Sequence, residues 1–263
     1  METIDLGNGK TKDISYWDNG QIQSEINKKY GTVDGKTIYW YQNGQKSYEY
    51  THHKTGRFRE KLTEWYENGQ ISIVYDIVDG TKDGQCISYY ENGQKRTELC
   101  IVDGLVEGQY TLYYENGQKS IECSFKNSIL TGKLIEWHEN GQKFHECSYK
   151  NGHYFEEWIE QGVLDGERDG IWTWWHENGV MAQQAKFENN RGIYKTEWDK
   201  DGNQIAQLNE EQILKEEESE REIAEQINPQ FNPIENSNVP LTDDEKLLGT
   251  DFWSDIYGDD FIK

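Results

Sequence analysis

The stretch Trp65-Tyr66-Glu67-Asn68-Gly69-Gln70 returns in near copies along most of the chain. Other copies begin at Trp17, Tyr41, Tyr90, Tyr114, His138 and His176, and a degenerate copy begins at Trp198. The glycines of the eight copies are spaced 24, 25, 24, 24, 24, 38 and 23 residues apart. A near-constant period with self-similar content indicates an array of one supersecondary unit, not a single wound domain.

Each unit reads as a β-hairpin, because Asn-Gly between two alternating segments is the strongest short-range hairpin signal. In all eight units an aromatic residue stands four places before the glycine, and apolar residues recur mainly six and eight places after it. A two-residue loop puts these two sets on opposite faces, whereas a three-residue loop with Gly69 left-handed brings them together. We therefore predict a three-residue loop over 67–69, with Trp65 and Tyr75 on one face.

The period predicts an all-β fold, an elongated single-layer antiparallel sheet of about eight tandem β-hairpins over residues 1–207. An acidic, partly helical tail follows over residues 208–263. The four cysteines read as reduced and mostly buried small hydrophobes. Cys86 and Cys100 fall on opposite strands of one unit and are expected on opposite faces.

A second ladder of rings stands three places before each turn glycine and is expected to point to solvent. Its members are Trp17, Tyr41, Tyr66, Tyr90, Tyr114, His138 and His176. In one interpretation these rings only cover the backbone of an exposed sheet. In the other they form a protein-binding surface, because tyrosine and tryptophan most often carry binding energy.

At these tandem copies the chain resembles the MORN-repeat-variant family. The Tyr/Trp-Tyr-Glu-Asn-Gly-Gln core and the spaced Asp-Gly turns carry the resemblance, which covers about residues 14–205. The resemblance implies a bacterial repeat protein, and relatives of this kind are often described as antitoxin or immunity proteins. Ordinary MORN repeats, a related pattern, are linked to membrane and scaffold roles in eukaryotes.

The array is interrupted by an insertion over about residues 152–166. This segment is both aromatic and acidic, and an insertion in a repeat array maps to a loop on one side, often the binding side. Its candidate partner-binding residues are Tyr154, Phe155 and Trp158. An extra hairpin that packs on the sheet is the alternative.

The tail divides into three parts. Residues 208–227 are glutamate-rich with sparse apolar points, which predicts a helix that caps the open end of the sheet. Residues 228–240 hold three prolines and read as a linker, and a capping box at Thr242 opens a short helix. The last part interleaves acids with the candidate partner-binding residues Phe252, Trp253, Ile256 and Tyr257. It reads either as a short motif for a basic, apolar groove, or as a segment packed on its own sheet or disordered.

The formal charge of -22 divides into -12 for the tail, with 16 acidic and 4 basic residues, and -10 for the repeats. Both parts repel nucleic-acid phosphates and anionic membranes and attract basic partners, so we expect a basic protein partner. The N-terminus lacks the regions of a signal peptide, and no apolar run approaches membrane-spanning length. A cytoplasmic location is therefore expected, without membrane insertion.

The chemistry of an enzyme is missing from the sequence. It holds no glycine-rich phosphate loop, zinc-type Cys or His spacing, or calcium loop, and nothing singles out a catalytic pair of carboxylates. We predict no catalytic, cofactor-binding or metal-binding residues.

Two functions from different classes follow. The first is an antitoxin or immunity protein that covers the basic site of a toxic enzyme, with charge steering association and aromatic anchors slowing release. The alternative is a scaffold or membrane-associated repeat protein, although the charge disfavours anionic lipid. A third idea is a tail that mimics nucleic acid.

Overall fold

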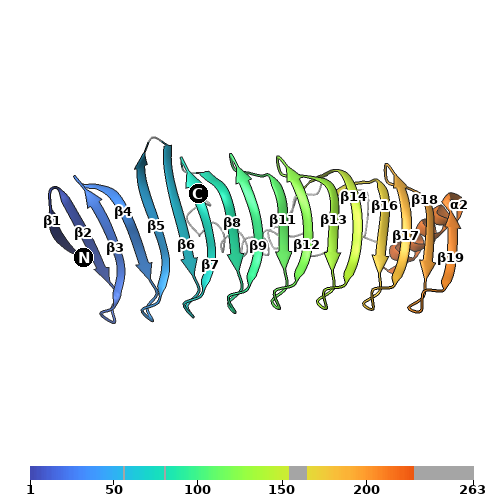
Figure 1. The fold of residues 1–263 in the computed structure, drawn as a ribbon, viewed down its shortest axis with the longest axis horizontal. Helices are drawn as coiled ribbons and strands as arrows, with labels where there is room; N and C mark the ends of the chain where they lie inside the picture. Colours follow the sequence, from blue (N-terminus) through green and yellow to red (C-terminus); the bar gives the residue numbers. More distant parts are fainter. Residues whose placement is uncertain (56, 80, 154–164, 228–263) are drawn as a thin grey trace.

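The computed structural model describes residues 1–55, 57–79, 81–153 and 165–227. In this part of the chain, 19 strands form one open antiparallel sheet, and a single helix follows the last strand (Figure 1). From N- to C-terminus the strands are β1 (Glu2–Gly7), β2 (Lys10–Tyr16), β3 (Ile22–Lys29), β4 (Thr32–Trp40), β5 (Lys46–Thr55), β6 (Arg57–Trp65), β7 (Ile71–Val78), β8 (Thr81–Tyr89), β9 (Lys95–Val102), β10 (Leu105–Val106), β11 (Gly108–Tyr113), β12 (Lys119–Lys126), β13 (Ile129–Trp137), β14 (Lys143–His153), β15 (Asp165–Arg168), β16 (Gly170–Trp175), β17 (Met181–Glu188), β18 (Arg191–Trp198) and β19 (Gln204–Asn209). The helix is α2 (Glu210–Ile227).

Strand pairing follows the chain order. Strands that follow one another in sequence pair antiparallel, with two exceptions. The short strands β10 and β15 do not pair with β11 and β16, but precede them along the same partners, β9 and β14. The strands lie side by side in one long row (Figure 1). This architecture confirms the predicted elongated sheet of tandem hairpins.

The repeated motif forms a three-residue loop, as predicted. The Gly69 amide donates to the Tyr66 carbonyl at 2.9 Å, and the Tyr66 amide donates to the Gln70 carbonyl at 2.8 Å. Gly69 has a φ of 85°, a left-handed conformation that glycine adopts without steric cost. The same pair of bonds recurs in the other loops, which together line one long edge of the sheet, called here the turn edge.

The predicted face of the tryptophans is wrong. Trp65 pairs with Ile71 but Glu64 pairs with Ile73, so β7 carries one extra residue just after the loop. This bulge shifts the pairing register by one residue. It therefore cancels the change of face that the three-residue loop produces. Trp65 and Tyr75 therefore lie on opposite faces.

The opposite edge of the sheet uses shorter turns. Asn189 and Asn190 connect β17 to β18 with φ values of 50° and 67°. Two consecutive left-handed residues define the two-residue turn that suits the twist of paired strands. This side is called the short-turn edge.

The two faces differ in burial. The buried face carries Leu62, Tyr75 and Cys86, and further along a larger group that we call the central cluster. The central cluster consists of Tyr110, Leu112, Ile121, Cys123, Phe125, Leu130, Leu134, Cys147, Trp172, Ala185 and Phe187. The open face carries Trp65 and its equivalents, which are mostly half-buried.

The cysteines follow the same division. Cys86 pairs with Leu99, and Cys100 is the next residue along β9, so Cys86 and Cys100 lie on opposite faces as predicted. Cys86, Cys123 and Cys147 are buried and Cys100 is half-buried, which confirms the predicted burial of most of them.

Helix α2 begins at a capping box. The Gln212 amide donates to Asn209 Oδ1 at 3.1 Å, and the Asn209 amide donates to Gln212 Oε1 at 3.0 Å. Ile213 is buried next to Gly192, on the side where the Phe187 ring also lies, so the helix lies on the buried face at the C-terminal end of the sheet. The first predicted tail helix is confirmed, and the predicted linker and second helix lie outside the described residues.

Candidate protein-binding surfaces

The turn edge is held together by asparagines. Asn68 Nδ2 donates to the carbonyl of Glu91 in the next loop at 2.8 Å, while Asn68 Oδ1 accepts the Gln70 amide of its own loop at 2.8 Å. Equivalent bonds to the next loop are made by Asn19, Asn43, Asn92, Asn116, Asn140 and Asn178. Each asparagine thus shapes its own loop and fixes the distance to the next one.

The predicted solvent-facing ladder has a structural role as well. The Tyr66 hydroxyl donates to the carbonyl of Tyr89 at 2.6 Å, and the Tyr90 hydroxyl donates to the carbonyl of Tyr113 at 2.7 Å. Trp17, Tyr41, Tyr114, His138 and His176 contact the equivalent carbonyl of the next unit. All seven rings are half-buried, so the expectation that they point freely to solvent is corrected. Their predicted role in partner binding stays a prediction.

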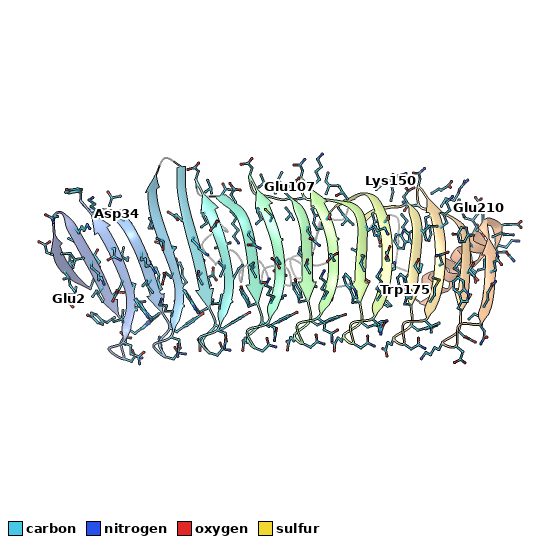
Figure 2. The ribbon with its side chains drawn as sticks, in the orientation of Figure 1. Glu2, Asp34, Glu107, Lys150, Trp175 and Glu210 are labelled. Carbon is cyan, nitrogen blue, oxygen red and sulfur yellow. The ribbon has the colours of Figure 1, made fainter. Side chains whose placement is uncertain are left out.

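Carboxylates occupy one position in six loops of the same edge (the lower edge in Figure 2), and the second loop carries Gln42 there. We call these residues the turn-edge acids: Asp18, Glu67, Glu91, Glu115, Glu139 and Glu177. All six are exposed, and their carboxylates make no ion pair or hydrogen bond with any residue that the structure describes. With two strands per hairpin, neighbouring acids of regular units are about 9 to 10 Å apart.

The glutamates of the open face are neutralised instead. Glu146 Oε1 lies 2.5 Å from Lys133 Nζ, and Glu146 Oε2 lies 2.7 Å from Lys143 Nζ. These ammonium groups, that of Lys133 first, hold the pKa of the Glu146 carboxyl below its usual value. Glu49 is also paired with two lysines, and Glu25, Glu98 and Glu122 are each paired with one. The uncompensated negative charge of the repeats therefore concentrates at the turn edge rather than on this face.

Aromatic side chains run along the open face, four places before each turn glycine. Lys46 Nζ lies 5.3 Å from the ring centroid of Trp65, and Lys143 Nζ lies 5.3 Å from that of Trp175. A cation over an indole is attracted by the ring quadrupole. From the sequence we placed these rings on the same face as Tyr75 and missed them as a surface of their own. Their presence in all eight units was a signal, but it did not show which face they occupy.

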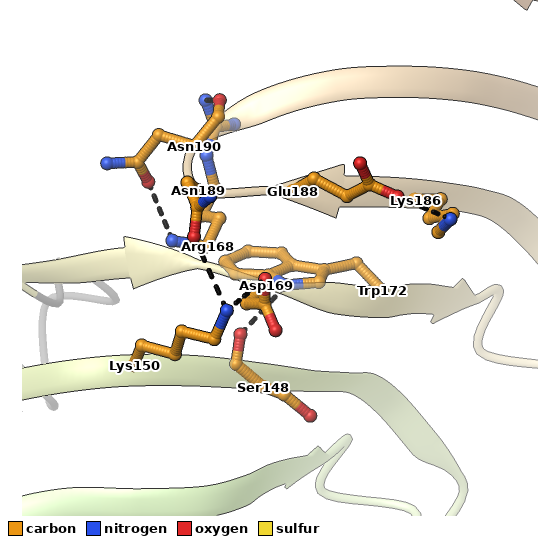
Figure 3. Close-up of polar contacts among 9 residues, drawn as sticks. All are labelled: Ser148, Lys150, Arg168, Asp169, Trp172, Lys186, Glu188, Asn189 and Asn190. Carbon is orange, nitrogen blue, oxygen red and sulfur yellow. Dashed lines mark hydrogen bonds and ion pairs between the residues drawn. The ribbon is translucent and has the colours of Figure 1, made fainter.

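Polar contacts fix the short-turn edge beside the insertion (Figure 3). Lys150 Nζ lies 2.9 Å from Asp169 Oδ1 and 3.3 Å from Asn189 Oδ1, and the Arg168 amide donates to Asn190 Oδ1 at 2.6 Å. These bonds tie β14, β15 and the β17–β18 turn together. They hold in place the two strand ends from which the insertion leaves the sheet.

Other predicted site residues lie outside the described residues. They are Tyr154, Phe155 and Trp158 of the insertion and Phe252, Trp253, Ile256 and Tyr257 of the tail. Among the residues that the structure describes, no group of His, Cys, Asp and Glu could hold a metal ion. No described helix combines the length and the apolar character needed to cross a membrane.

Four segments of the chain match one family model, described as MORN repeat variant: residues 82–103, 106–127, 130–151 and 168–189. Four hairpins thus match as MORN-variant repeats. Each match contains a turn-edge loop and most of its two strands. Three of the four matched segments, 106–127, 130–151 and 168–189, lie on the strands that carry the central cluster.

No curated protein matches the chain. A solved structure described as "Crystal Structure of TcdB2-TccC3-Cdc42" matches 78% of this chain at 8% identity, with a TM-score of 0.18. The chain spans 14% of that chain's length.

Proposed function

We propose that this chain is a non-enzymatic, protein-binding repeat module that binds a basic protein through its turn-edge acids. In its sharper form, the module is a cytoplasmic antitoxin or immunity protein that covers the basic site of a toxic enzyme. The MORN-variant repeats support a binding module, and the observation that carries the proposal is the row of exposed, unpaired carboxylates.

The order of this row favours binding. The loops are fixed to one another by the Asn68 and Tyr66 bonds and their equivalents, so the main chain that carries the turn-edge acids is regularly spaced before a partner binds. A preformed array loses less conformational entropy on binding than mobile side chains on mobile loops. Concentrated negative charge also raises the association rate with a basic partner.

The test compares two variants with the same change in net charge. One carries Glu67→Gln, Glu91→Gln and Glu115→Gln at the turn edge; the other carries Glu211→Gln, Glu216→Gln and Glu218→Gln on α2. Each protein and the wild type capture proteins from the native cell lysate at low salt, where charge attraction is least screened. Mass spectrometry identifies the retained proteins, and each is then expressed alone and together with the chain.

The proposal expects a basic protein that wild type and the α2 variant retain and the turn-edge variant loses. It also expects that this protein stops growth when expressed alone and that the chain restores growth. Retention independent of the turn-edge acids would overturn the binding surface. A harmless captured protein would overturn the antitoxin role and leave a scaffold.

One observation favours the scaffold alternative. In the described part of the chain, β1 pairs only with β2 and β19 only with β18, so both ends of the sheet present an unpaired edge. Unpaired edges can template pairing with another chain. Self-association of the purified protein in sedimentation experiments would support this alternative.

A further inference from the structure

The central cluster is more deeply buried than a single-layer sheet permits. Leu130, Leu134 and Cys147 expose 0%, 1% and 0% of their surface. On one face of a sheet, side chains from strands about 4.8 Å away cover a residue's flanks, but its outer end points away from the sheet. Full burial of side chains as large as leucine therefore requires a second layer.

The described residues do not supply that layer. Their only element off the sheet is α2, which contacts chiefly β18 and β19. The central cluster extends from β11 to β17, and most of it lies beyond the helix. No described element therefore accounts for the cover.

Helix α2, which precedes the C-terminal segment, lies on the same face of the sheet as the central cluster. Ile213 of α2 lies next to Gly192, on the side where the Phe187 ring also lies, which places the helix on the buried face. Residues 228–263 follow α2 directly and number 36. An extended chain of this length spans up to roughly 120 Å. The central cluster crosses only about 25 Å of sheet, because neighbouring strands lie about 4.8 Å apart.

The composition of residues 228–263 is suited to covering an apolar cluster. Phe252, Trp253, Ile256, Tyr257 and Phe261 place five large apolar side chains within ten residues, alternating with acids. Such side chains can cover the cluster while the acids face water. The insertion 154–164 is shorter, and both of its ends are held where His153 pairs with Asp165.

We propose that residues 228–263 dock on the buried face of their own sheet and form the second layer over the central cluster. The tail aromatics then serve as an intramolecular cover and are not free to bind a partner. This proposal is independent of the turn-edge acids, which lie at the loops, so either proposal can fail without the other.

Native thiols report on the cover in the full-length chain. Cys123 and Cys147 belong to the central cluster, and Cys100 lies on the open face as an internal reference. One variant carries Phe252→Ser, Trp253→Ser, Ile256→Ser and Tyr257→Ser. The control carries Tyr154→Ser, Phe155→Ser and Trp158→Ser in the insertion. Each protein reacts with a thiol reagent under native conditions, and mass spectrometry gives the rate at each cysteine.

The proposal expects Cys123 and Cys147 to react at least about tenfold faster in the tail variant, because their protection depends on the docked segment. Cys100 should keep its rate, and the insertion variant should match wild type. Unchanged rates in the tail variant would overturn the proposal. So would faster reaction only in the insertion variant.

A crosslink tests the contact without weakening it. The full-length chain carries the photo-reactive residue p-benzoylphenylalanine at position 253, and light is applied to the monomer at low concentration. Crosslinks within one chain to β11–β14 are expected. Crosslinks only between chains, only to the open face, or none at all would overturn the proposal.

Discussion

The hydroxyl of Tyr66 donates a 2.6 Å hydrogen bond to the main-chain carbonyl of Tyr89, one hairpin further along the chain. The bond joins neighbouring repeats at their loops. In a repeat protein, stability is approximately the sum of the stabilities of the units and of their interfaces. The ring before each Glu-Asn-Gly loop therefore contributes to the interface term, whatever else it binds.

Removing one such hydroxyl should weaken one interface. Tyr90→Phe keeps the ring but removes the 2.7 Å bond to the Tyr113 carbonyl. The expected loss is about 1 kcal/mol of unfolding free energy. Urea unfolding followed by fluorescence measures it. Tyr16→Phe is the matched control, because the Tyr16 hydroxyl contacts only the exposed Glu2 carboxylate and its loss should change little. Equal effects of the two variants would contradict the role of the ladder.

The asparagine ladder can be separated into its two bonds. Asn116 donates to the Glu139 carbonyl at 2.8 Å and accepts the Gln118 amide at 2.9 Å. Asn116→Ala removes both bonds and should cost about 1 to 2 kcal/mol, whereas Asn116→Asp keeps the acceptor and should cost less. The urea midpoints of the two variants check this order. A larger loss in Asn116→Asp would show that local charge outweighs the acceptor bond.

The loop glycine is required for its backbone angle. Gly69 has a φ of 85°, which L side chains rarely adopt. Gly69→Ala should therefore lower the unfolding free energy by about 1 kcal/mol. Gly69→Asn should cost less, because asparagine enters the left-handed region more readily. Thermal unfolding of both variants provides the comparison, and equal losses would point to contacts of the new side chain instead.

The ion pairs of the open face should make a pH-dependent contribution to the free energy of unfolding. Lys133 and Lys143 lower the pKa of Glu146 in the folded state, so the pair stabilises the fold above the unfolded glutamate pKa of about 4.3. This contribution is lost as the pH falls through the folded pKa. It should amount to less than about 1 kcal/mol, because both lysines are well exposed.

The measurement compares wild type with the variant Lys133→Met plus Lys143→Met in urea at pH 7 and pH 3. The difference in stability should be present at pH 7 and shrink at pH 3. In a Glu146→Gln background it should vanish at both pH values. A difference that persists there would come from the packing of the lysine stems.

Local chemistry made the hairpins, the three-residue loop and the presence of α2 predictable, whereas the cap of α2 was not predicted. Asn68-Gly69 specifies a turn by itself, and the capping box of Asn209 and Gln212 is seen in the structure. The faces were not predictable in the same way. The bulge between Ile71 and Ile73 depends on where β7 pairs with β6, and no residue type at that point requires it.

The hydrogen bonds between repeats could not be predicted from the sequence either. Tyr66 bonds a main-chain atom 23 residues away, and main-chain acceptors are the same whatever the residue. The sequence held one signal for the asparagine bonds between loops. The last copy has Asp201 where the others have asparagine, and no later hairpin in the described chain follows to accept a bond.

The two edges of the sheet have different tolerance for changes in length. The insertion lies between β14 and β15, at the short-turn edge, and the extended hairpin of β5 and β6 also projects there (Figure 1). Extra residues at that side leave the spacing of the Asn68-type bonds intact, whereas one added residue in a three-residue loop would break a bond on each side. A peptide or a fluorescent label grafted into this protein should therefore be accepted at the short turns and rejected at the long ones.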